Sequence, residues 1–168
     1  MLIASYAKIN LFLEVTGKLP NGFHEVNTVF SSIDLFDTLT FTLTKTPSVN
    51  VLSNVPDICG DKNLIYKVST YLQSIHNTDC GVTIYLKKRI PIASGMGGGS
   101  SNAAVTIVVL NDLWGIGLSK EEMHNIASTL GSDLNFFLVG GTAIGKNRGD
   151  VIASLPDIDV DNILLVNP

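Results

Sequence analysis

The sequence is short of charge, and of basic residues in particular. Charged residues make up 15% of its 168 positions, with 11 Lys plus Arg against 15 Asp plus Glu and a formal net charge of −4. A protein that binds by neutralising many phosphates needs a basic surface. We therefore expect no nucleic acid partner.

Long apolar runs and a targeting segment are also missing. A membrane helix needs about 20 consecutive apolar residues, and the longest runs here are residues 107–110 and 163–166. The N-terminus has no basic stretch, and Lys8 and Asn10 interrupt any apolar signal segment. Cys59 and Cys80 have neither metal-site spacing nor the density of a disulfide scaffold, which predicts two reduced thiols. Together these features predict a cytoplasmic protein with no membrane partner.

The low charge has a second implication. Soluble domains usually carry about 25% charged residues, whereas 45% of this chain is hydrophobic. So few charges predict that part of the surface is covered by something else. Residues 162–168 read as a buried strand without a polar tail, although chain ends are commonly polar and frayed. The sequence therefore predicts a truncated part of a longer protein.

Residue periodicity predicts one α+β domain over residues 1–168. Alternation predicts strands at residues 6–15, 26–33, 38–44, 49–53 and 82–88, the first two forming a hairpin with an Asn21-Gly22 turn. Helical spacing predicts helices at about 62–76 behind Asp61 as N-cap, from Ser100 to about 114, and from a capping box at 119–122 to 131. Short strands are expected at 136–139, 142–145 and 151–155, and from Ile163 onward.

A glycine-rich segment carries the strongest functional signal. Four of the five residues from Gly95 to Gly99 are glycine, so successive backbone N–H groups can turn inward around an anion without Cβ clashes. A helix that starts at Ser100 would add unpaired N–H groups and the positive end of its dipole. A strand, a glycine loop and a helix in this order predict a phosphate site. The alternatives are a flexible turn and tight packing between the helix and the strand.

The loop does not fit three well-known phosphate motifs. The Walker A pattern needs Gly-Lys-Ser/Thr, yet Ser100 follows Gly99 directly. The dinucleotide fingerprint needs glycine where Ser100 stands, within an alternating βαβ chain that this sequence lacks. The protein-kinase loop joins two strands, and the sequence contains neither His-Arg-Asp nor Asp-Phe-Gly. A different phosphate-binding family is indicated.

Three segments resemble the GHMP kinase superfamily, which includes galactokinase and homoserine, mevalonate and phosphomevalonate kinases. Residues 91–104, ending in Gly-Gly-Gly-Ser-Ser-Asn-Ala-Ala, resemble its second motif. Residues 7–13 together with Gly22-Phe23-His24 resemble the first motif, and residues 131–137 a further one. These variants are similar to the branch that phosphorylates a cytidyl alcohol in isoprenoid precursor synthesis. The alternatives are another small-molecule kinase of the superfamily and a catalytically silent domain that only binds a nucleotide or a partner. Met96, Ser132 and Asn135 depart mildly from its pattern.

The resemblance implies the α+β fold of ribosomal protein S5 domain 2, with ATP and Mg²⁺ as cofactors and a small-molecule cytidyl substrate. It implies that the superfamily's C-terminal domain is missing, so this chain alone is expected to be inactive. By the same resemblance, the residues that bind ATP would be Pro91, Ile92, Ala93, Ser94, Gly95, Met96, Gly97, Gly98, Gly99, Ser100 and Ser101.

The resemblance also implies two catalytic residues. Asp133 would take the proton of the substrate hydroxyl, and Lys8 would be the cation beside it. Read without the family, Asp133 is the N-cap of the following segment and Lys8 a solvated strand lysine. Ser100 and Ser101 could cap the helix, contact phosphate or bind Mg²⁺, and the sequence does not separate these roles. The metal ligands are therefore not assigned.

Substrate contacts follow from the resemblance alone. Phe23 and His24 would line a cytosine pocket, and Asn10 would be a polar substrate contact. Without the family, His24 is an ordinary loop histidine. Residues 61–64 resemble the stretch that borders the adenine, although Asp61 is equally well explained as a helix cap.

Overall fold

The computed structural model describes residues 1–20, 22–76 and 78–166. Its elements are β1 (Leu2–Lys18), β2 (His24–Thr44), β3 (Val49–Ser53), the 3-10 turn η1 (Pro56–Ile58), α1 (Leu64–His76), β4 (Gly81–Lys87), α2 (Gly98–Leu113), α3 (Lys120–Leu130), α4 (Leu134–Val139), β5 (Thr142–Lys146) and β6 (Val151–Leu155). The predicted α+β composition is confirmed. The expected turn at Asn21 and the last two residues of the expected C-terminal strand lie outside the described residues.

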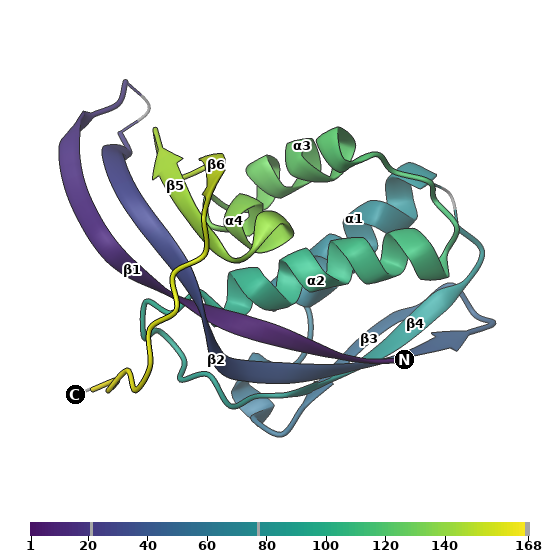
Figure 1. Ribbon diagram of the computed structural model, residues 1–168. Coiled ribbons are helices and arrows are strands. Elements are labelled where there is room, and N and C mark those ends of the chain that lie inside the picture. Colours follow the sequence, from purple (N-terminus) through teal and green to yellow (C-terminus); the bar gives the residue numbers. More distant parts are fainter. Residues whose placement is uncertain (21, 77, 167–168) are drawn as a thin grey trace.

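One sheet of six strands forms a layer on which the helices lie together (Figure 1). The order is β3-β4-β2-β5-β6, with β1 paired to β2, and β3 with β4 is the parallel pair. Strand β2 is the centre of this sheet: Thr38–Thr44 pairs with β4 and Thr28–Ser31 pairs with β5. The two ends of the β1–β2 hairpin therefore belong to different parts of the sheet.

The long hairpin is confirmed, but the two strands expected at 26–33 and 38–44 are one continuous strand. Asp34 and Leu35 are extra residues opposite Tyr6 and Ala7, where the register shifts. Such a bulge bends a strand without ending it. Asp37 follows it and is fully buried, because backbone N–H groups from another segment satisfy its carboxylate.

The main core lies between the sheet and helices α1, α2 and α3. Its buried side chains include Leu39, Phe41, Val82, Ile84, Ile65, Val68, Leu72, Ala103, Ile107, Leu110 and Ile126. The capping box of α3 is confirmed: Ser119 Oγ accepts from Glu122 N at 3.2 Å, and Ser119 N donates to Glu122 Oε2 at 2.8 Å. Within the described residues, no helix is both long and apolar enough for a membrane crossing.

Two helix starts differ from the prediction. Helix α1 begins at Leu64, and Asn63 rather than Asp61 caps it, because Ile65 N donates to Asn63 Oδ1 at 2.9 Å. Helix α2 begins at Gly98, two residues before Ser100, with Gly97 as its N-cap in a left-handed conformation. The last two glycines of the loop therefore form the first turn of the helix.

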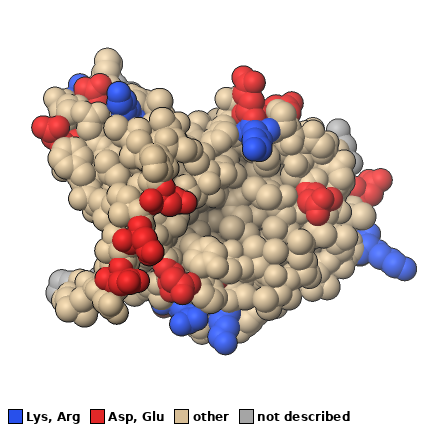
Figure 2. Space-filling view, viewed as in Figure 1, with Lys and Arg blue, Asp and Glu red and all other residues tan. Residues whose placement is uncertain are grey.

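The strands expected at 136–139 and from Ile163 onward are wrong. Residues 134–139 form α4, and Phe136 packs on Phe30 with ring centroids 4.9 Å apart. A short apolar run fits a buried helix turn as well as a strand, so periodicity does not separate them. Residues 156–166 have no regular structure, and Leu164 and Val166 are 86% and 79% exposed. Figure 2 shows few charges on most of this face, with acidic side chains gathered toward the C-terminal segment.

Candidate functional site

The glycine-rich segment connects β4 to α2 and lines a cavity of about 390 Å³. Of the residues expected to bind ATP, all except Met96 and Ser101 line this cavity. The facing wall comes from η1 and the start of α1 and includes Ile58, Lys62, Asn63 and Leu64. The loop and the 61–64 stretch, which are far apart in sequence, therefore form two walls of one cavity.

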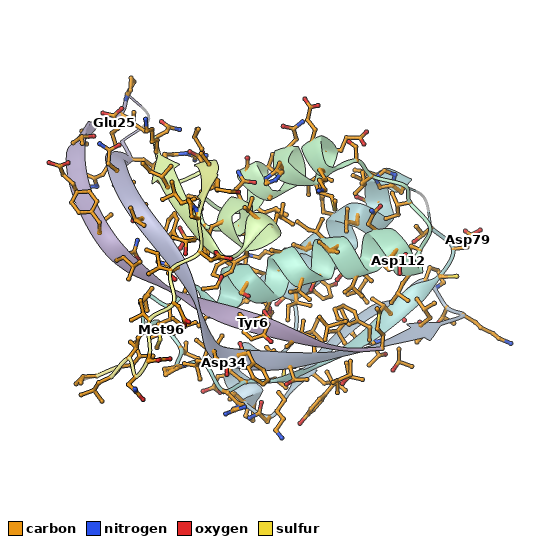
Figure 3. All side chains as sticks on the ribbon, in the orientation of Figure 1. Tyr6, Glu25, Asp34, Asp79, Met96 and Asp112 are labelled. Carbon is orange, nitrogen blue, oxygen red and sulfur yellow. The ribbon has the colours of Figure 1, made fainter. Side chains whose placement is uncertain are left out.

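Met96 and Ser101 are turned away from the cavity. Met96 is 7% exposed and packs with Ala7 and Ile90, and its carbonyl accepts from the backbone N–H of Lys8 at 3.0 Å (Figure 3 labels Met96). Ser101 is 2% exposed, and its Oγ lies 2.7 Å from Ser5 Oγ on β1. Because the helix begins at Gly98, neither serine is its N-cap: Ser101 is a packing contact to β1, while Ser100 lines the cavity.

Two loop glycines allow the backbone to approach lysine side chains closely. Gly97 has φ +67°, and a Cβ there would lie 2.6 Å from Phe137 Cζ and 3.2 Å from Lys8 Cγ. A Cβ on Gly98 would lie 2.9 Å from Lys88 Nζ. Because these two positions carry no side chain, the loop and the helix start can pack against two lysines. The sequence left tight packing open as an alternative to phosphate binding, and these two glycines pack closely while they also line the cavity.

Lys8 and Asp133 lie together beside this loop. Lys8 Nζ is 3.9 Å from Asp133 Oδ2, and the two side chains are 7% and 35% exposed. Burial lowers the pKa of Lys8, and the Asp133 carboxylate opposes that shift. Asp133 precedes α4 but its side chain makes no capping hydrogen bond among the described residues. The carboxylate therefore faces a cation and is partly open to solvent, as a proton acceptor would need to be.

Residues 63–141 match the family model described as the GHMP kinases N terminal domain. The GHMP kinase N-terminal domain is found over this part of the chain. The expected fold is thereby confirmed. The mevalonate kinase of Methanococcus jannaschii shares it, with a TM-score of 0.68 at 17% identity over 96% of this chain and 56% of that one.

Relatives with higher identity share a single name. The chain is 43% identical over 170 aligned positions to the 4-diphosphocytidyl-2-C-methyl-D-erythritol kinase of Prochlorococcus marinus (strain MIT 9215), covering all of this chain and 55% of the relative. It is 45% identical over 169 positions to the kinase of that name from Thermoanaerobacter pseudethanolicus (strain ATCC 33223 / 39E), covering 99% of this chain and 57% of the relative.

A solved structure agrees with these relatives. A crystal structure of 4-(cytidine 5'-diphospho)-2C-methyl-D-erythritol kinase matches the GHMP kinase domain with a TM-score of 0.81 and 32% identity, over 92% of this chain and 55% of that one. The chain thus spans about 55% of the length of the proteins it matches.

The three expected substrate contacts lie along the β1–β2 hairpin of the GHMP kinase domain. Asn10 is exposed and accepts a hydrogen bond from Lys8 Nζ at 2.7 Å. Phe23 and His24 are exposed at the hairpin tip. Asn10 pairs with Phe30, and the six residues from there to His24 span about 20 Å of strand. The structure therefore joins Asn10 to the Lys8–Asp133 pair but leaves Phe23 and His24 at a distance that only an extended ligand would bridge.

A buried polar group beneath the cavity was missed by sequence reasoning. Lys88 Nζ lies 2.8 Å from Asp37 Oδ2, and Asn102 Nδ2 donates to the same oxygen at 3.0 Å. The backbone N–H groups of Arg89 and Ile90 donate to Asp37 Oδ1 at 2.7 and 2.8 Å. Lys88 and Asn102 line the cavity. Asp37 falls between the strands expected at 26–33 and 38–44, so no sequence signal marked it as buried.

Proposed function

We propose that this chain is the nucleotide-binding half of an ATP-dependent kinase that phosphorylates the 2-hydroxyl of 4-diphosphocytidyl-2-C-methyl-D-erythritol in isoprenoid precursor synthesis. The observation that carries the proposal is the 3.9 Å approach of Lys8 and Asp133 beside a glycine loop that opens a helix. Identity above 40% across the chain with two kinases of that name supports this substrate over other alcohols. The free cysteines fit a cytoplasmic enzyme.

ATP would occupy the cavity between the loop and the start of α1. Its volume of about 390 Å³ lies within the range of small-molecule sites. The triphosphate would lie at the start of α2, where unpaired N–H groups and the helix dipole favour an anion. The adenine would lie toward Ile58 and Leu64, which supply apolar surface on the facing wall.

Mg²⁺ fits this site as an ion that accompanies ATP. The described residues contain no group of three His, Cys, Asp or Glu side chains that would hold a metal on their own. Mg²⁺ keeps several waters and is commonly held by substrate phosphates with few protein ligands. Ser100 lines the cavity, and we assign its hydroxyl as a ligand of this ion. Bound there, the ion would neutralise phosphate charge.

Asp133 and Lys8 would act on the substrate hydroxyl. As the hydroxyl oxygen bonds to the γ-phosphorus and the bond to ADP breaks, the hydroxyl proton passes to Asp133. Lys8 lies beside the Asp133 carboxylate and would offset negative charge during transfer. Asn10 would contact the substrate near the reacting hydroxyl, and Phe23 and His24 would hold the cytosine at the hairpin tip.

The remaining length of the relatives would complete the site. Positioning two reactants contributes about 7 to 11 kcal/mol, so we expect the 168-residue chain to bind ATP weakly without turnover. A fusion to the C-terminal remainder of the Thermoanaerobacter relative should convert ATP and the cytidyl alcohol to ADP and a phosphomonoester. Efficient turnover by the chain alone would overturn the half-site proposal. A fusion that prefers mevalonate or homoserine would contradict the proposed cytidyl substrate.

A further inference from the structure

A chain of hydrogen bonds on β1 and β2 leads from the hairpin backbone to the Lys8–Asp133 pair. Lys8 Nζ donates to Asn10 Oδ1 at 2.7 Å, and Asn10 Nδ2 donates to Thr28 Oγ1 at 2.7 Å. Thr28 Oγ1 in turn donates to the carbonyl oxygen of Phe12 at 2.7 Å. Each group therefore donates to the next one, from the Lys8 ammonium to the Phe12 carbonyl.

The orientation of the Asn10 amide depends on Thr28. The Lys8 ammonium has donors only, so it needs the amide oxygen to face it. The amide nitrogen then points at Thr28 Oγ1, which is free to accept because its own proton goes to Phe12. Thr28 is 1% exposed, whereas Asn10 is exposed. The buried hydroxyl is therefore the fixed end, since an exposed amide on its own has a broad terminal torsion.

The strand geometry explains how Thr28 reaches both groups. Asn10 pairs with Phe30 and Phe12 with Val29, so Leu11 is an extra residue in β1. A bulge of this kind re-aims neighbouring side chains. Thr28 also pairs with Gly145 of β5, where a Cβ would lie 3.0 Å from Thr28 Cγ2. The Thr28 side chain thus lies among three strands, with its hydroxyl toward β1 and its methyl group toward β5.

We infer that Thr28 is a positioning residue: it fixes the Asn10 amide, which holds the Lys8 ammonium beside the Asp133 carboxylate. The functional importance of this arrangement rests on the proposed kinase activity, but the arrangement itself is testable without any reaction. Asn10 then has a role toward Lys8 in addition to its proposed contact with substrate. Removing the acceptor for a buried ammonium destabilises its charged form.

The decisive variants are Thr28→Val, which keeps the shape and removes the hydroxyl, and Thr28→Ser, which keeps the hydroxyl. In the 168-residue chain, NMR titration of the Lys8 side chain should give a lower pKa in Thr28→Val than in wild type. Exchange of the Asn10 side-chain amide protons should be faster in the same variant. Thr28→Ser should keep the Lys8 pKa and the Asn10 amide exchange at their wild-type values. Thr106→Val is the matched control, because this buried hydroxyl donates to the Asn102 carbonyl within α2.

Unchanged Lys8 titration and Asn10 exchange in Thr28→Val would overturn the inference. A wild-type measurement decides it even if that variant does not fold. The Asn10 amide proton that bonds to Thr28 should exchange with water more slowly than its geminal partner, and equal exchange would also overturn the inference.

The same variants in the fusion protein test the link to catalysis. Thr28→Val should lower kcat about tenfold while the KM for ATP changes by less than about twofold, because the lost bond acts on the pair and not on the nucleotide. A rise in the KM for ATP with normal kcat would contradict the positioning role. A wild-type fusion without kinase activity would overturn the proposed function, whereas the NMR result would still decide the role of Thr28.

Discussion

Replacing Asp37 with alanine should lower the free energy of unfolding by about 3 to 5 kcal/mol, because the change leaves a buried cation without its partner. The Asp37 side chain is fully buried and that of Lys88 is 8% exposed, with Nζ and Oδ2 2.8 Å apart. Lys88 Nζ also lies against Gly98 at the start of α2, where the helix dipole disfavours a cation. Arg89 and Ile90 would lose their N–H acceptor as well. These losses share one site, so they do not add fully.

Urea unfolding of the 168-residue chain measures the effect. Lys88→Met should be destabilising too, whereas the double change Asp37→Leu with Lys88→Met should recover much of the loss, since no buried charge is left. Asp79→Ala is the control: this exposed carboxylate should matter by less than about 0.5 kcal/mol. A loss below about 1 kcal/mol for Asp37→Ala would refute the view that this pair holds the loop and the helix start together.

Three further changes test the site. In the fusion protein, Asp133→Asn should lower kcat at least about 100-fold with unaltered ATP affinity; normal turnover would make Asp133 structural. Gly99→Ala should keep the fold, because its Cβ would meet only Leu64 Cδ1 at 3.9 Å, but should weaken ATP binding measured by calorimetry; binding equal to that of the control Gly17→Ala would exclude close phosphate approach. Because burial lowers the pKa of Lys8 below 10.5, the unfolded chain holds its proton to higher pH, so wild-type stability should rise with pH between the folded pKa and 10.5. Lys8→Met should lack this rise, and parallel curves would contradict it.

Local chemistry determined the features that the sequence predicted correctly. The capping box at Ser119 needs only residues within one helical turn, and the β1–β2 hairpin follows from alternation on both sides of a turn. The glycine loop between a strand and a helix is contiguous in the chain. The approach of Lys8 to Asp133 is different, because the two residues are far apart in sequence and only the family resemblance predicted their partnership.

Tertiary structure alone decided the features that depend on which segment packs alongside. Helix α2 begins two residues earlier than expected, so Ser101 lies inside the helix, where it contacts Ser5 on β1 and does not line the cavity. Asp37 can be buried because Lys88 pairs with it. The Thr28 hydroxyl hydrogen-bonds Asn10 next to the bulge in β1. A sequence pattern shows the period of each element, but the partners of a buried polar group come from other elements, so only the packed fold determines them.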